Sequence, residues 1–255
     1  MIILISKKEL EEVAKISGLK LWQQEKHYFQ TLILQALKNK NLIFKGGTYL
    51  WFFHGLNRFS EDLDFTTMGD VELDLPKQIV SFLKYYGVKS DYLVVSNKKD
   101  SYSFRVGIEG PLYDGNPRSK CFVYADISKR EKILLPAKNY DVFFAYYNLP
   151  VSIITGCALE EVFAEKIRAI MTRNKARDLY DLWFLIKKQI TCNVSQINKK
   201  LSYCKESFNL DKFFKSIGNH KANYKLELNN LIFGNFPEFE VVEKDIKNYF
   251  QEVCK

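Results

Sequence analysis

The stretch from Leu42 to Thr67, LIFKGGTYLWFFHGLNRFSEDLDFTT, constrains the fold more strongly than any other part of the chain. It begins with a short apolar run that predicts a strand over residues 42–45, and this run ends at a double glycine. A second strand is predicted from Arg58 onward, because polar and apolar residues alternate there. One face of that strand would carry Arg58, Ser60, Asp62 and Asp64. The apolar residues between them would face a core, so the pattern predicts an exposed polar row on a rigid support.

Hydrophobic periodicity predicts a mixture of helices and strands up to about residue 155 and helices alone after it. Ser6 and Glu9 form a capping-box pattern at the start of the first helix. The helices predicted in the first part are 6–16, 21–40 and 76–86, and its later strands are 88–96, 102–109, 120–128 and 141–147. The helices predicted in the second part are 159–172, 176–188, 194–205, 210–216, 221–231 and 241–253. The sequence therefore predicts an α+β fold with two domains, an α/β part (1–155) and an all-α part (156–255).

The composition indicates which kind of partner and which cellular environment to expect. The chain has 38 Lys and Arg against 30 Asp and Glu, which gives a net charge of +8. This balance favours an anionic partner such as nucleic acid or nucleotide, although a lysine-rich proteome produces the same balance. The five cysteines are scattered without a CxxC spacing, and only three histidines are present, so no zinc cluster is predicted. We expect reduced thiols in a cytoplasmic protein without a membrane segment.

Two aspartates one residue apart on a strand, Asp62 and Asp64, suit a divalent metal that also binds phosphate oxygens. Phosphoryl and nucleotidyl transfer require such a metal, although acidic pairs also occur on solvated strand edges. The upstream residues Gly46, Gly47 and Thr48 favour a metal and phosphate site over a solvated strand edge. Glycines between a strand and a helix let the backbone approach an anion closely, although they also form ordinary tight turns. Together the two features predict a triphosphate and metal site.

A third carboxylate is available at Asp126, on the strand predicted over residues 120–128. A neighbouring strand could bring Asp126 beside Asp62 and Asp64. It would then act as a further metal ligand or as the base that deprotonates a hydroxyl. The alternative is an aspartate in solvent at the end of a strand.

Lys166 falls within the apolar arc of the helix predicted over residues 159–172, whereas Glu161 and Glu165 lie on the polar face. A lysine directed toward the interior is usually paired, because removing an ammonium group from water is costly. The pattern predicts that Lys166 meets a phosphate or a buried carboxylate. The alternative is that its side chain runs along the apolar stripe to reach water.

Asp178 and Asp181, on the next predicted helix, are the candidates for such a carboxylate. They lie about 60° apart around the helix axis and are interleaved with leucines. Two structural alternatives remain open. Asp178 could stabilise the helix N-terminus, and Arg177 with Asp181 could form an ordinary pair one turn apart.

The combination of these motifs resembles the AbiEii-type nucleotidyltransferases, toxins of bacterial and archaeal toxin–antitoxin and phage-defence systems within the DNA polymerase β-like superfamily. The matching motifs are KGGTYL (45–50), RFSEDLDF (58–65), EK (165–166) and RDLYDL (177–182). Their order and spacing fit over residues 42 to about 186. The resemblance implies a polymerase β-like mixed sheet with flanking helices, followed by a helical bundle.

The resemblance also implies a role for each motif. The residues assigned to nucleotide binding are Gly46, Gly47, Thr48, Arg58, Ser60 and Asp181. Asp62 and Asp64 would bind Mg²⁺, and Lys166 and Asp178 would complete the catalytic group, with Asp181 as a second option for Asp178. Asp126 is a further catalytic candidate because of its place on the predicted strand, and the base could be Asp126, Asp178 or Asp181. Ser60 corresponds to a position that can become modified in some relatives.

The activity implied is Mg²⁺-dependent transfer of an NMP from an NTP to an acceptor, which in some relatives is the 3′ end of tRNA. A separately encoded antitoxin is the implied protein partner. Two other classes remain open on the same residues, namely a metal-dependent phosphodiesterase or nuclease and a nucleotide-binding module without catalysis. The active site is expected in a cleft between the α/β part and the helical part.

Overall fold

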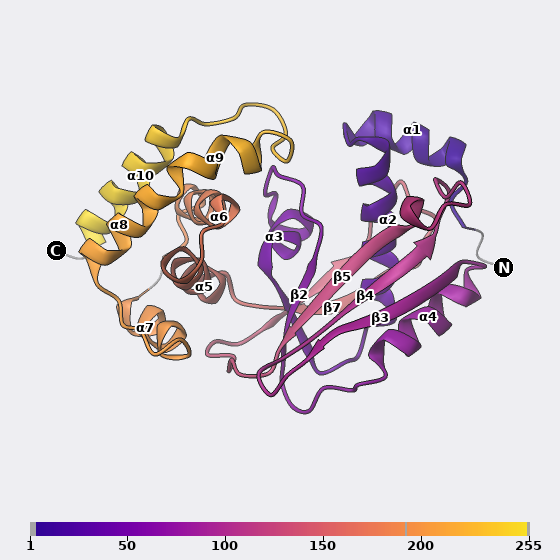
Figure 1. Cartoon of the computed structure of the whole chain (residues 1–255), viewed down its shortest axis with the longest axis horizontal. Coiled ribbons are helices and arrows are strands. Elements are labelled where there is room, and N and C mark those ends of the chain that lie inside the picture. Colours follow the sequence, from indigo (N-terminus) through magenta and orange to yellow (C-terminus); the bar gives the residue numbers. More distant parts are fainter. Residues whose placement is uncertain (1–3, 192, 254–255) are drawn as a thin grey trace. The chain divides into compact units, whose positions relative to one another are not determined.

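A computed structural model describes residues 4–191 and 193–253 of the protein (Figure 1). Contacts divide the chain into two compact units. The first unit contains the residues up to Tyr49 together with Glu61–Arg130 and Ala137–Gly156. The second contains Leu50–Ser60, Glu131–Pro136 and the residues from Cys157 onward. Two short segments that precede residue 155 therefore group with the helices.

A seven-stranded mixed sheet is the centre of the first unit. Its strands are β1 (Leu42–Lys45), β2 (Leu63–Thr67), β3 (Lys89–Asn97), β4 (Ser101–Glu109), β5 (Cys121–Ser128), β6 (Lys138–Val142) and β7 (Ser152–Gly156). They lie in the order β3-β4-β5-β2-β1-β7-β6. The β2–β5 and β1–β7 pairs are parallel and the other neighbours are antiparallel. This mixed sheet with flanking helices confirms the predicted fold class.

The helices of the first unit follow from capping and amphipathic signals. They are α1 (Lys7–Ser17), α2 (Leu21–Ala36) and α4 (Leu75–Tyr85), and α3 (Gly46–His54) begins in this unit directly after β1. Ser6 caps α1 in the predicted box with Glu9. Helices α2 and α4 pack on β5 and β4, where alternate residues such as Val123 and Ala125 are buried. The residues between them face the other side of the sheet.

The second unit is helical. Its helices after residue 157 are α5 (Leu159–Thr172), α6 (Ala176–Lys187), α7 (Val194–Ser202), α8 (Leu210–Asn219), α9 (Lys221–Leu228) and α10 (Phe239–Val253). Helix α5 contacts α6, α7 and α8, and α6 contacts α9 and α10. Apolar stripes meet in a core that contains Phe163, Leu182, Ile217 and Phe250, all at most 2% exposed. These helices agree with the predicted ones except near their ends.

After residue 135, one strand prediction is wrong and one strand was missed. The strand expected over residues 141–147 lies at Lys138–Val142 instead, and β7 was not predicted. The aromatic run after β6, which has the composition of a strand, forms a turn in which Tyr147 N–H donates to Phe144 O at 2.9 Å. The Tyr147 hydroxyl lies 2.9 Å from His27 Nδ1, and burial lowers the pKa of His27 to about 3. The aromatic rings there pack around a neutral, structural histidine.

Three of the cysteines, Cys121, Cys157 and Cys204, have reduced thiols, whereas Cys192 and Cys254 lie outside the described residues. Within the described part of the chain, no helix is both long and apolar enough to cross a membrane.

Candidate functional site

The aspartate pair lies where the chain enters β2. Asp64 is the second residue of that strand, and Asp62 precedes it; both are half-buried. On the neighbouring antiparallel strand β1, Lys45 is the residue opposite Asp64. Thr48, fully buried in the first turn of α3, donates a hydrogen bond from Oγ1 to the backbone carbonyl of Asp62 at 2.6 Å. The start of α3 therefore fixes the segment that carries both carboxylates.

Gly46 makes this arrangement possible. It adopts φ +78°, a left-handed conformation that favours glycine, at the junction of β1 and α3. A Cβ atom at this position would lie 2.2 Å from Oδ2 of Asp64. The backbone at the start of α3 therefore runs directly beside the Asp64 carboxylate. The N–H groups of a helix N-terminus favour an anion such as phosphate, so a backbone that could bind an anion adjoins a carboxylate that could bind a metal.

Asp126 lies on the other side of β2. Strand β5 pairs with β2 in parallel, and Asp126 is the residue in register with Asp64. Residues in register on neighbouring strands project to the same face of a sheet. On β4, Ser103 donates a hydrogen bond from Oγ to Oδ1 of Asp126, which orients the carboxylate. Asp64 and Asp126 therefore lie on adjacent strands of one sheet face.

The donor set suits a hard divalent cation. Asp62, Asp64 and Asp126 offer carboxylate oxygens only, which suits Mg²⁺ or Mn²⁺ better than zinc or copper. Across residues 4–191 and 193–253, no group of three or more His, Cys, Asp and Glu side chains is arranged to hold a metal by itself. Mg²⁺ is usually bound by one or two carboxylates together with water and substrate phosphates. The residues present fit that mode of binding.

A second group of charged residues lies within the second unit, and we call it the charge cluster: Arg58, Lys166, Arg173, Asp178 and Asp181. Arg58 binds Asp181 through two hydrogen bonds, Nε to Oδ1 at 2.6 Å and Nη2 to Oδ2 at 2.7 Å. Lys166 Nζ lies 2.6 Å from Asp181 Oδ2 and 2.9 Å from Asp178 Oδ1. Arg173 Nε donates to Asp178 Oδ2 at 2.8 Å. Both aspartates are fully buried, so each is neutralised by two cations.

Electrostatics keep every member of the cluster ionised. Burial alone would raise the pKa of both aspartates. Lys166 and Arg173 instead hold the pKa of Asp178 below its usual value, and Arg58 and Lys166 do the same for Asp181. Burial alone would lower the pKa of Lys166, and the two aspartates raise it instead. The cluster thus contains three cations and two anions. The prediction that Lys166 points inward to a buried carboxylate is confirmed.

The predicted strand from Arg58 onward is wrong. β2 begins at Leu63, and Arg58 forms only an isolated bridge with Ile232. Arg58 is 2% exposed and Ser60 is 9% exposed, so the predicted exposed polar row does not exist at these two positions. The reason is a partner far along the chain, because Asp181 lies 123 positions downstream. Alternation in sequence cannot distinguish an arginine in solvent from one that is buried against such a carboxylate.

Sequence reasoning also missed a buried lysine on α7. Lys200 is fully buried, and its Nζ lies 2.7 Å from Glu161 Oε1 and 2.9 Å from Glu165 Oε1. The other carboxylate oxygen of Glu161 accepts the N–H groups of residues 134 and 135, both at 2.9 Å. Glu161 and Glu165, predicted to lie on the polar face of α5, are therefore buried. The sequence did contain a signal for this burial. Lys200 lies at helical spacing within the apolar stripe of Ile197 and Leu201, just as Lys166 lies within the apolar stripe of α5.

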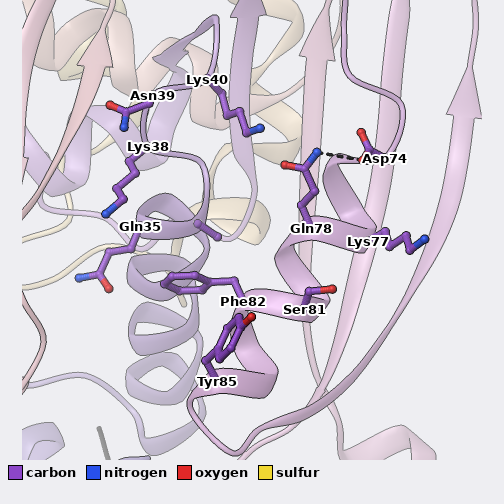
Figure 2. Close-up of a pocket in the computed structure, with 11 residues that line it drawn as sticks. Gln35, Lys38, Asn39, Lys40, Asp74, Lys77, Gln78, Ser81, Phe82 and Tyr85 are labelled. Atoms are coloured by element: carbon purple, nitrogen blue, oxygen red, sulfur yellow. Dashed lines mark hydrogen bonds between the residues drawn. The ribbon is translucent and has the colours of Figure 1, made fainter. Parts of the chain in front are cut away.

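A surface cavity lies in the first unit (Figure 2). It is formed by the end of α2, the residues that follow it, and α4, and its lining includes Lys38, Gln78 and Tyr85. Gln78 Nε2 donates to Asp74 Oδ2 at 2.9 Å across its wall. None of the predicted site residues lines this cavity, so it is separate from the aspartates of β2.

Gly46→Ala is expected to remove nucleotide binding, because its methyl group would displace the Asp64 carboxylate. Gly55→Ala is the matched control, since Gly55 has nearly the same backbone angle, φ +77°, but no atom within 4 Å of an added Cβ. Both variants carry the left-handed strain, about 1–2 kcal/mol. Titration with an NTP and circular dichroism of both variants will test this. Equal NTP affinity in the two variants would show that the close approach to Asp64 has no role.

Two solved structures show the same fold. JHP933 from Helicobacter pylori is 20% identical, the alignment covers 91% of this chain and 91% of that chain, and the TM-score is 0.59. MenT4, a nucleotidyltransferase toxin from Mycobacterium tuberculosis H37Rv, is 16% identical, with 98% of this chain and 90% of that chain covered and a TM-score of 0.63. No curated protein sequence matches the chain.

A family model described as "Nucleotidyl transferase AbiEii toxin, Type IV TA system" matches residues 29–251. The match spans most of the chain and includes both groups of charged residues described above. The chain therefore belongs to the AbiEii family of nucleotidyltransferase toxins of type IV toxin–antitoxin systems.

Proposed function

We propose that this nucleotidyltransferase uses Mg²⁺ to move an NMP from an NTP to the 3′ hydroxyl of an RNA, with tRNA as the first candidate. The observation that supports this most strongly is the approach of the Gly46 backbone to Asp64, with 2.2 Å between the position of an added Cβ and Oδ2. This approach places a helix N-terminus, which favours a phosphate, beside a carboxylate that can bind a metal.

Each residue of the first unit has a role in this proposal. Gly46, Gly47 and Thr48 hold the triphosphate at the first turn of α3. Asp62 and Asp64 would hold Mg²⁺, and the bound ion would supply positive charge that neutralises the phosphates. Asp126 accepts the proton of the attacking hydroxyl, and its hydrogen bond from Ser103 orients it for this step.

The charge cluster of the second unit supplies positive charge. With three cations and two anions it keeps a net charge of +1, which would compensate part of the triphosphate charge through Lys166. In place of the nucleotide contacts predicted for Arg58 and Asp181, we propose that these two residues position Lys166. All three nitrogens of the Arg58 guanidinium donate within the second unit, to Asp181 and to the carbonyl of Phe59. That both groups serve one active site stays a prediction.

Incubation with total tRNA and each labelled NTP in turn, with Mg²⁺ or with a chelator, tests the proposal. We expect label on RNA with one or a few of the four NTPs, and none in the presence of the chelator. Shortening of the RNA without NTP would indicate the phosphodiesterase alternative. Saturable NTP binding without transfer to any RNA would indicate a binding module. Membership in a type IV toxin–antitoxin family implies an antitoxin as a further partner. A second set of transfer reactions therefore includes the antitoxin.

A further inference from the structure

The sheet face that carries Asp64 and Asp126 continues into a row of aromatic side chains. On β5, Phe122 and Tyr124 alternate with buried residues, so they project to the same face as Asp126. Tyr124 is 38% exposed, and Phe122 is half-buried. Helices α2 and α4 pack on the opposite face, so the first unit does not use these rings in its core. Apolar rings beside a catalytic carboxylate call for a functional explanation.

Arg105 of β4 lies close to both rings. It is the residue opposite Tyr124 in the β4–β5 pair. Its guanidinium carbon lies 4.4 Å from the ring centroid of Phe122 and 6.0 Å from that of Tyr124. These distances are typical of cation–π contacts. Within the part of the chain that the structure describes, Arg105 forms no ion pair with a carboxylate, so its charge is available to an anion.

The order of the strands decides which substrate this face serves. In the sheet, β2 with the metal-binding aspartates lies between β1, which leads into the phosphate-binding start of α3, and β5. In nucleotidyl transfer the attacking oxygen and the leaving pyrophosphate lie roughly in line on opposite sides of the reacting phosphorus. A triphosphate on the β1 side therefore requires the acceptor on the β5 side, which is the side of Asp126, Tyr124 and Phe122.

We propose that Tyr124, Phe122 and Arg105 form a stacking platform for the single-stranded 3′ end of the RNA acceptor. The terminal base stacks on Tyr124, the preceding base reaches Phe122, and Arg105 contacts the backbone phosphate. Residues two apart on a strand are separated by about 6–7 Å, so a base on Tyr124 keeps its ribose close to Asp126. Stacking on aromatic rings beside a basic group is the usual mode of binding single strands without sequence preference. This inference rests on the proposed function, since it names the acceptor of the same site.

The test compares Tyr124→Ala with Tyr85→Ala. Tyr85 is 84% exposed on α4, on the side of the sheet that the helices cover, and serves as the matched control. A short, 5′-labelled single-stranded RNA is titrated without NTP, and transfer is then measured at varied RNA and NTP concentrations. We expect Tyr124→Ala to bind RNA about 5- to 150-fold more weakly, since one stacked base contributes about 1–3 kcal/mol. Tyr124→Phe and Tyr85→Ala should bind like the wild type.

In the transfer assay, Tyr124→Ala should raise the KM for RNA and leave the KM for NTP unchanged. Unchanged RNA affinity in Tyr124→Ala, or an equal loss in Tyr85→Ala, would overturn the platform. A raised KM for NTP with unchanged RNA affinity would overturn it as well, because the ring would then stack on the incoming base. Phe122→Ala provides a second variant, and circular dichroism checks that each variant is folded. The binding arm needs no NTP, so failure of the wild type to transfer any NMP would refute the proposed function without deciding the platform.

Discussion

Asp64→Asn is expected to lower nucleotidyl transfer by about a thousandfold or more while the protein stays folded. The change keeps the shape of the side chain and removes the charge that would hold Mg²⁺. A metal that stabilises the transition state contributes several kcal/mol, and each 1.36 kcal/mol is a factor of ten in rate. Asp64 is half-buried on β2, so the amide keeps contact with solvent. The measurement is the initial rate of label transfer from NTP to tRNA at saturating Mg²⁺, together with thermal unfolding.

Asp141→Asn is the control for this experiment. Asp141 is an exposed aspartate on β6, which is the edge strand of the same sheet, at the opposite end from β3. The substitution removes one strand carboxylate at a position with no assigned role, so activity should stay at the wild-type level. Wild-type transfer by Asp64→Asn would exclude Asp64 as a metal ligand. Equal losses in both variants would indicate a general effect of charge and would likewise contradict the proposed site.

The second large effect is expected from Asp181→Asn, which should lower the free energy of unfolding by about 3–5 kcal/mol. Asp181 is fully buried between Arg58 and Lys166, and the neutral amide would remove the carboxylate charge that both cations contact. Urea unfolding at pH 7 measures the loss. The control is Glu240→Gln, which removes an exposed pair with Lys221 and should leave the urea midpoint unchanged. A midpoint for Asp181→Asn equal to that of the control would show that the charge cluster contributes nothing to stability.

The same aspartates predict how stability depends on pH. The pKa of Asp178 and of Asp181 is lower in the folded protein than in the unfolded chain, because Lys166 and the two arginines favour the charged form more than burial opposes it. Their stabilising contribution is therefore complete above the unfolded pKa, about 3.9, and is lost as the pH falls through the lower folded values. We expect the difference in unfolding free energy between wild type and Asp181→Asn to shrink below about pH 4. A constant difference down to pH 3 would contradict this assignment.

What could be predicted from the sequence was local, periodic or tied to a motif. The inward-facing charge of Lys166 followed from a helical wheel alone, because an α-helix repeats every 3.6 residues wherever it packs. The Gly46 turn and the aspartates of β2 followed from the motifs of one continuous stretch. The pairing of Arg58 with Asp181 could not be predicted, since 123 positions separate the two residues and the alternation around Arg58 suggests an exposed side chain. The missed strand β7 has the same cause: its place in the sheet depends on β1 and β6 as neighbours, not on its own sequence.

The path of the chain through the two units has a consequence for how such a toxin can be divided. Residues 50–60 and 131–136 belong to the second unit although they lie within the sequence of the first, so the backbone passes from one unit to the other five times. No single cut separates the units. A fragment ending near residue 155 would keep Arg58 and lose Asp181, which leaves a guanidinium without its carboxylate. Proteolysis or a nonsense mutation in the helical half should therefore inactivate the whole protein, and two independently translated halves should not recombine as separate domains would.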